Sequence, residues 1–307
     1  MPIYLPIAGL SLDVVLLLAM GLGVGVLAGL FGIGGGFILT PLLIFLGIPP
    51  AIAVGTGAAQ VVASSISGAY AHWLRRNVDV KLGLFLIAGG LTGSITGVML
   101  QQVLRAAGHL DFFISAAYVV MLGVIGGLML IESSQTILAT SRAKGPLTAR
   151  RGGQHTWLQG LPFKQRFRTA KLYVSAIPPL GIGLFAGWLT AIMGVGGGFL
   201  LIPALIYLLR LPTRLAMGTA AFQIIFVTAV TTILQSMNNF NVDLMLAAPL
   251  MLGGVTGAQI GVRLGAKLRA EQLRLLLAVL VLSVAARIAV DLVRTPQEVY
   301  VLDGSGR

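Results

Sequence analysis

The sequence reads GIGGGFILTPLLI at residues 32–44 and GVGGGFLLIPALI at residues 194–206. In each copy three consecutive glycines precede an apolar run of roughly ten residues, 37–46 and 199–209. A helix of that length extends about 15 Å, whereas the hydrocarbon core of a bilayer is about 30 Å thick. Neither run can cross a membrane alone, and each glycine triplet predicts a break in a helix.

The composition predicts a protein that lives in a bilayer. Of its 307 residues, 57% are hydrophobic and only 10% are charged, and the mean hydropathy is +0.95. Soluble domains carry about 25% charged residues. Apolar runs of about 20 residues recur along the chain, so we predict an all-α polytopic membrane protein. The sequence has no Cys and its three His are scattered, so no metal site and no cofactor are expected.

The two halves of the chain resemble each other beyond the glycine triplets. Three further pairs of blocks match in the same order: GTGAAQ at 55–60 with GTAAFQ at 218–223, NVD at 77–79 with NVD at 241–243, and GGLTGSITGV at 89–98 with GGVTGAQIGV at 253–262. Chance does not readily produce four ordered matches. They indicate an internal duplication, which is how many secondary transporters are built.

The charge pattern divides the chain into parts. We expect a first transmembrane repeat at 1–132, a basic cytoplasmic linker at 133–171, a second transmembrane repeat at 172–293 and a polar tail at 294–307. The linker holds eight Lys or Arg and no Asp or Glu. Because basic residues collect on the cytoplasmic side of membrane proteins, the net charge of +12 indicates orientation, and no nucleic-acid partner is expected.

The relative orientation of the halves depends on how the short runs are counted. If each short run turns the chain back, each half has five elements, and the second half must be upside down relative to the first. If it only extends its neighbour, the halves are parallel. The inverted arrangement puts more of the 21 Lys and Arg on the same side as the linker than the parallel arrangement does. We therefore predict two inverted five-element repeats, with about eight full transmembrane helices, two short half helices and both termini periplasmic.

The two helix breaks are the candidate binding site. A helix that starts after a glycine triplet has unpaired N–H groups and the positive end of its dipole at its first turn, which suits an anion. Two such starts would converge near the midplane on a small anionic substrate, helped by hydroxyl and amide side chains. The expected substrate-binding residues are Gly34, Gly35, Gly36, Phe37, Thr56 and Gln60 in the first half, and Gly196, Gly197, Gly198, Phe199, Thr219 and Gln223 in the second.

Other interpretations of these residues stand beside this one. Gln60 and Gln223 would serve equally well as hydrogen-bonding glue between helices. Glycines spaced four apart are typical of close helix packing, and this describes a further set: Gly89, Gly93, Gly97, Gly253, Gly257, Gly261 and Gly265. We find no nucleophile and base pair and no paired carboxylates at membrane depth, so an enzyme is not expected.

The paired GxGGGF blocks, with the repeated GT, NVD and GGxTG segments, resemble the sulfite exporter TauE/SafE family. The resemblance extends over nearly the whole chain apart from the linker and the tail. It implies a multi-pass permease of the bacterial inner membrane, which moves small sulfur-containing anions such as sulfite, thiosulfate or organosulfonates. An anion channel of the same architecture is the alternative. Besides the substrate, membrane lipids are the expected partners, and the oligomeric state stays open.

Overall fold

The computed structural model describes residues 2–32, 34–142, 163–167, 169–170, 172–265, 279 and 281–290. The first half comprises β1 (Pro2–Leu5), β2 (Leu10–Asp13), α1 (Val14–Phe31), α2 (Gly36–Phe45), α3 (Pro50–Leu74), α4 (Val80–Ala106) and α5 (Leu110–Arg142). The second comprises β3 (Lys164–Phe167), β4 (Leu172–Ser175), α6 (Ile177–Met193), α7 (Gly198–Tyr207), α8 (Thr213–Leu234), a π-helical turn η2 (Gln235–Asn239) and α9 (Leu244–Gly265). A short helix, Val281–Val290, follows.

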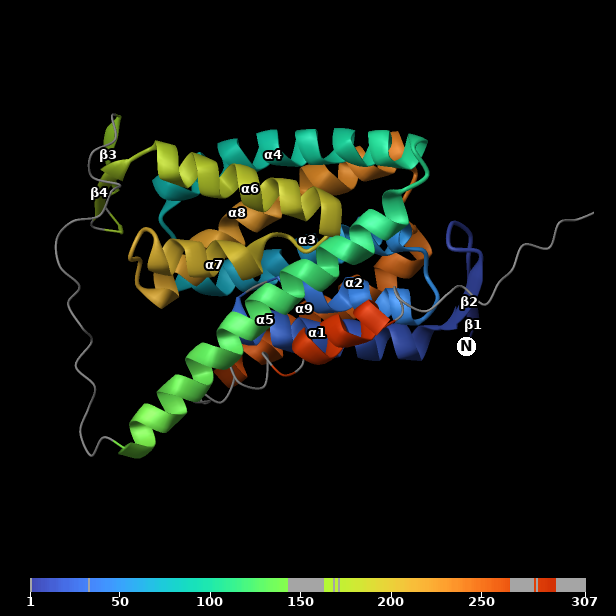
Figure 1. Ribbon diagram of the computed structural model, residues 1–307, viewed down its shortest axis with the longest axis horizontal. Helices are drawn as coiled ribbons and strands as arrows, with labels where there is room; N and C mark the ends of the chain where they lie inside the picture. The colour runs from blue at the N-terminus through green and yellow to red at the C-terminus, as the bar shows by residue number, and fades with distance from the viewer. Residues whose placement is uncertain are drawn as a thin grey trace, which may run out of the picture.

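The helices are long and apolar enough for a multi-pass membrane protein, as predicted. Among the described residues, five segments have the length and composition of a membrane span: Val14–Phe31, Pro50–Leu74, Val80–Ala106, Thr213–Asn239 and Leu244–Leu264. The helices α2 and α7 are ten residues each and start in the middle of the bundle, from where they run toward opposite ends (Figure 1). They match the two short runs of the sequence.

Two antiparallel β-hairpins were not predicted. β1 pairs with β2 from Pro2 opposite Asp13, and β3 pairs with β4 from Lys164 opposite Ser175. Each hairpin directly precedes the first helix of a half, and the two lie at opposite ends of the molecule (Figure 1). β3 falls in the part of the chain that we expected to be linker, and α5 continues to Arg142, beyond the expected boundary at 132. The prediction of an all-helical chain therefore applies to the membrane-crossing elements only.

Close helix pairs join one half to the other. α1 packs along α9, α4 packs along α6, and α3 and α8 pack together. A Cβ added to Gly93 would lie 1.9 Å from the Leu184 carbonyl oxygen, and one added to Gly257 would lie 2.2 Å from that of Leu22. These positions tolerate no side chain, so the packing role predicted for the glycine series in α4 and α9 is confirmed there.

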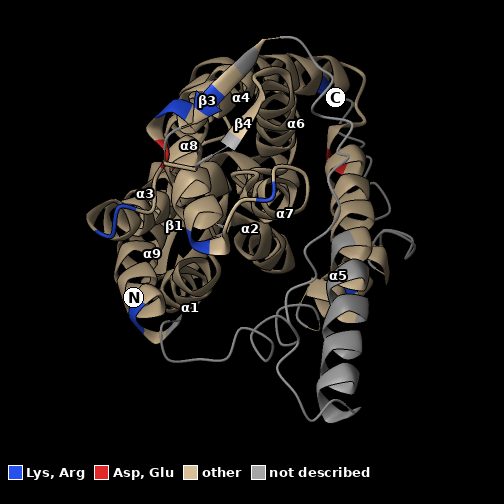
Figure 2. Ribbon diagram, turned by 90° about the vertical axis from the view of Figure 1, so that its left-hand side faces the viewer, with Lys and Arg blue, Asp and Glu red and all other residues tan. Residues whose placement is uncertain are grey.

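Basic residues gather at the end of the molecule that carries β3 and β4 (Figure 2). Lys81, at the start of α4, donates a hydrogen bond of 2.8 Å to Gln165 of β3, and its ammonium lies 5.8 Å from the centre of the Phe167 ring. The start of α8 lies at the same end, because Gly218 packs against Asn77. The end of α3, the start of α4, β3, the segment leading into α8 and the end of α9 meet at this end. The described Lys and Arg residues of these segments are Arg75, Arg76, Lys81, Arg166, Arg210, Arg214 and Arg263.

Candidate functional site

The predicted site is built on the first turns of α2 and α7. The N-cap residues Gly35 and Gly197 have φ angles of 75° and 68°, in the left-handed region. Glycine adopts this conformation without the steric penalty that a Cβ brings, so the triplets produce the predicted breaks. Neither glycine can cap its helix with a side chain. An anion at this site would meet the backbone N–H groups of each first turn and the positive end of each helix dipole.

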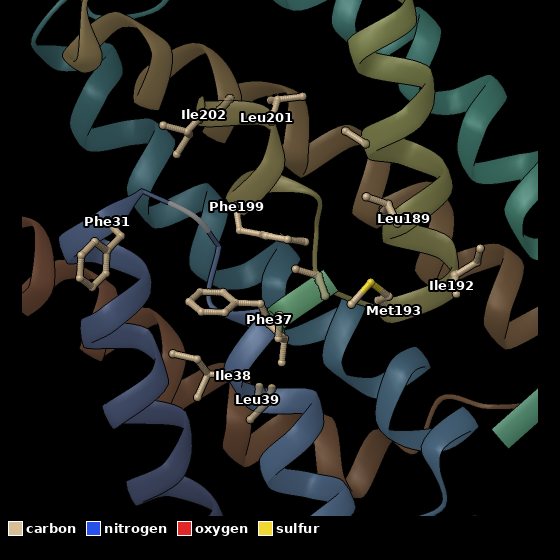
Figure 3. Packing of buried hydrophobic residues seen from close by; sticks show 14 of the residues in the cluster. Phe31, Phe37, Ile38, Leu39, Leu189, Ile192, Met193, Phe199, Leu201 and Ile202 are labelled. Atoms are coloured by element: carbon tan, nitrogen blue, oxygen red, sulfur yellow. The ribbon is translucent and has the colours of Figure 1, made fainter. Parts of the chain in front are cut away.

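The structure brings the two helix starts together at the centre of the bundle. A Cβ added to Gly36 would lie 2.6 Å from the carbonyl oxygen of Gly194 and 3.0 Å from the Cα of Val195. The rings of Phe37 and Phe199, the next residue of each helix, stack with their centres 6.2 Å apart (Figure 3). The two glycine loops therefore touch each other.

The helix starts are enclosed by apolar side chains in this conformation. All six triplet glycines and both phenylalanines are buried. Val61 of α3 and Ile224 of α8 close over the loops, because a Cβ added to Gly196 would lie 2.6 Å from a Val61 methyl and 3.1 Å from an Ile224 methyl. An oxyanion could reach the first-turn N–H groups only after these side chains move apart.

The two threonines of the predicted site have structural partners. The hydroxyl of Thr56 accepts a 3.1 Å hydrogen bond from the backbone N–H of Asp243, and the hydroxyl of Thr219 accepts one of 3.1 Å from that of Asp79. Both threonines are fully buried. The GT segment of each half is thus joined to the NVD segment of the other half, at opposite ends of the bundle.

The aspartates of the NVD segments also hold the hairpins. Each caps the helix that follows it, because an Asp79 oxygen accepts from Leu82 N–H at 3.0 Å and an Asp243 oxygen accepts from Leu246 N–H at 3.2 Å. The second oxygen of Asp79 accepts from Ala170 N–H at 2.9 Å, in the β3–β4 turn. The second oxygen of Asp243 accepts from Ile7 N–H at 3.0 Å, in the β1–β2 turn. Each hairpin is therefore fastened by the other half of the chain.

The two glutamines of the predicted site are buried without partners. Gln60 and Gln223 are both 0% exposed, and neither amide oxygen nor amide nitrogen of either side chain has a hydrogen-bond partner among the described residues. Gln60 lies against Gly254 of α9, and Gln223 lies against Gly90 of α4. The glue interpretation requires a hydrogen bond to the neighbouring helix, and neither side chain makes one to any residue that the structure describes.

A small pocket beside Gly34 adds residues that the sequence did not single out. Its walls include Ser64, Ser65, Gly68 and His72 of α3. It has room for about one water molecule. The two serines follow Gln60 by one turn of the same helix, and this spacing was the only signal in the sequence that could have pointed to them.

A bundle of apolar helices with two broken helices meeting at its centre defines a class, that of the multi-pass membrane transporters. The chain belongs to the Sulfite exporter TauE/SafE family, whose profile matches residues 17–288.

The chain is similar to two bacterial proteins over most of their length and to part of a longer plant protein. The probable membrane transporter protein YjnA of Bacillus subtilis is 30% identical over 87% of this chain and 96% of its own. The probable membrane transporter protein YunE of the same organism is 24% identical over 89% of this chain and 96% of its own. Sulfite exporter TauE/SafE family protein 3 of Arabidopsis thaliana is 27% identical over 39% of this chain and 26% of its own. No solved structure gave a significant match.

Proposed function

We propose that this protein is a secondary transporter of small sulfur-containing oxyanions, such as sulfite, thiosulfate or organosulfonates, in the inner membrane of a bacterium. The observation that carries the proposal is the meeting of the first turns of α2 and α7, since helix N-termini bind anions through their free N–H groups and dipoles. The family to which the chain belongs is described as sulfite exporters, which supports the substrate class.

The two halves act as inverted repeats in this proposal. The contacts between the halves come in matching pairs, which supports this arrangement. α1 of the first half packs on α9 of the second, and α6 of the second packs on α4 of the first. In the same way, Thr56 bonds to Asp243 and Thr219 bonds to Asp79. The basic end with β3 and β4 faces the cytoplasm by the positive-inside rule, together with the 133–171 linker, and both termini are periplasmic.

Transport proceeds by alternating access around the paired helix starts. The enclosed state described here is one in which neither side reaches the first-turn N–H groups, because Val61 and Ile224 cover the loops. Movement of one half against the other uncovers the loops from one side at a time. Gln60 and Gln223 then turn their amide N–H groups to the bound oxyanion, which gives these side chains the hydrogen bonds that they lack in the closed state.

Flux of radiolabelled sulfite into proteoliposomes tests the proposal. A transporter should show uptake that saturates with sulfite concentration, and Gly197→Leu should abolish it, because a side chain at this left-handed position would press on the Ala186 carbonyl oxygen. Absence of sulfite, thiosulfate and sulfonate flux would overturn the proposal. Non-saturating flux with single-channel currents would instead establish the anion channel.

A further inference from the structure

The pocket beside Gly34 is polar in a way that its packing does not explain. Ser65 is 4% exposed, and its hydroxyl has no hydrogen-bond partner among the described residues. The Nδ1 atom of His72 is also buried without one. Ser64 donates to the carbonyl oxygen of Gly34 at 3.3 Å. Hydrogen-bonding groups without partners are costly inside a membrane protein, so the pocket is one that a polar partner would stabilise.

The pocket is next to the site on the β3–β4 side. A Cβ added to Gly34 would lie 3.5 Å from the Ser65 hydroxyl oxygen, so the pocket opens directly beside the glycine loop of α2. His72 lies two turns further along α3, and Arg75 follows it at the basic end of the helix. From the basic end toward the loop, the order of the pocket residues is therefore His72, then Ser65 and then Gly34.

The corresponding place in the other half is filled. In the register that aligns Gln60 with Gln223, Gly68 corresponds to Thr231 and His72 corresponds to Gln235. Thr231 shares a 2.7 Å hydrogen bond with Ser94 of α4. Thr231 thus places a hydrogen-bonded side chain at the position where Gly68 has none.

A cluster of hydrogen-bonded amide side chains begins one helical turn after Thr231. Gln235 donates to Gln101 of α4 and, at 3.2 Å, to the carbonyl oxygen of Ala191. Asn239 of η2 donates to Gln235 at 2.8 Å, and Arg105 donates to the carbonyl oxygen of Asn239. These amide groups, which contact the last turn of α6 ahead of the α7 loop, are thus bonded to one another, in contrast to the Ser65 hydroxyl and His72 Nδ1.

We propose that the pocket of Gly34, Ser65, Gly68 and His72 is an access subsite for the oxyanion, on the β3–β4 side of the helix starts, and that the Gln101–Gln235–Asn239 cluster is the gate that closes the opposite side. The inference rests on the proposed transport function and deepens it. The Ser65 hydroxyl and an imidazole N–H of His72 donate to the oxyanion on its way to the loops. The pocket must widen as it fills, since it now holds about one water molecule.

Gly68 offers a variant that fills the pocket with little cost to the fold. A Cβ added there meets nothing within 4 Å, and Gly68→Thr copies the residue that fills the corresponding place in the other half. Gly23→Thr is the matched control, because Gly23 is an exposed helical glycine of α1 whose added Cβ also meets nothing within 4 Å. In proteoliposomes we expect Gly68→Thr to lower the initial rate of sulfite uptake at least tenfold, and Gly23→Thr to leave it unchanged.

The absence of Cys from the sequence allows a second measurement that needs no transport. Gly68→Cys should react with a charged, impermeant methanethiosulfonate added from the β3–β4 side only, whereas Thr231→Cys should stay unreactive from both sides. Sulfite uptake by Gly68→Thr at the wild-type rate, or a Gly68→Cys that is unreactive from the β3–β4 side, would overturn the subsite and leave the transport function standing. A wild-type protein that moves no oxyanion would overturn the proposed function itself.

Discussion

Substitution of Gln60 and Gln223 distinguishes a binding role from a packing role most clearly, because each side chain is fully buried and has no hydrogen-bond partner among the described residues. We consider Gln60→Met and Gln223→Met, which keep an unbranched side chain of similar length and remove both polar atoms. A buried polar atom without a partner costs about 1–3 kcal/mol, so each variant should be as stable as the wild type or more stable. At about 2–4 °C for each kcal/mol, the melting temperature should stay level or rise by several degrees.

The same substitutions should weaken transport. A hydrogen bond from an amide to a charged oxyanion contributes about 1.5–3 kcal/mol, which corresponds to a rise of about ten- to hundredfold in the sulfite concentration that gives half-maximal uptake. The assays are thermal unfolding in detergent and initial rates of sulfite uptake in proteoliposomes across a range of concentrations. Higher stability combined with lower affinity is expected if the two glutamines bind the oxyanion, and it is not expected if they serve only in packing.

Gln101→Met is the matched control for stability. Gln101 is also a buried glutamine of a membrane-spanning helix, but its amide donates to the carbonyl oxygen of Ala191 at 2.9 Å. Its replacement should therefore lower the melting temperature. A binding role is refuted if Gln60→Met and Gln223→Met keep the wild-type half-saturation for every oxyanion tested, or if they lose stability as Gln101→Met does.

Three further predictions concern the contacts that hold the halves together, each checked by thermal unfolding in detergent. Thr56→Val leaves the buried Asp243 N–H without its acceptor and should cost about 1–3 kcal/mol, whereas Thr56→Ser should restore the stability; equal loss in both would argue against the bond. Asp243→Ala releases the β1–β2 turn and the start of α9 and should cost about 2–4 kcal/mol, and an unchanged melting temperature would contradict the observed bonds. Gly93→Ala should prevent close approach of α4 and α6 and lower stability strongly, while Gly181→Ala, in open space, should have little effect; similar behaviour of the two would refute the packing role.

The sequence predicted those features that depend on local composition. The expected short runs at 37–46 and 199–209 correspond to Gly36–Phe45 and Gly198–Tyr207, because successive glycines adopt the left-handed conformation that interrupts a helix. The β-hairpins escaped prediction. Each strand has only four residues, so an alternation of apolar and polar side chains is too short to detect. The hairpin of 164–175 also begins in a stretch that we interpreted as a linker because of its basic charge.

Partners across the bundle could not be predicted from the repeat. The alignment of the halves pairs Thr56 with Thr219, and the two residues do play the same role. The alignment does not show that each of them bonds to an NVD aspartate of the other half. The aspartates themselves carried a usable signal, since an Asp directly before an apolar helix is a preferred N-cap. Ser65 carried only its spacing of about one turn from Gln60, because its importance comes from the lack of a hydrogen-bond partner among the described residues.

Binding of an oxyanion at the paired helix starts is the central claim, and selenite, an electron-dense analogue of sulfite, tests it directly. An experimental structure of the full chain with selenite, located by anomalous scattering from selenium, should show the anion between the first turns of α2 and α7, within hydrogen-bond distance of the N–H groups of Phe37 and Phe199. A protein that transports selenite, yet binds it only away from both helix starts, would contradict the account.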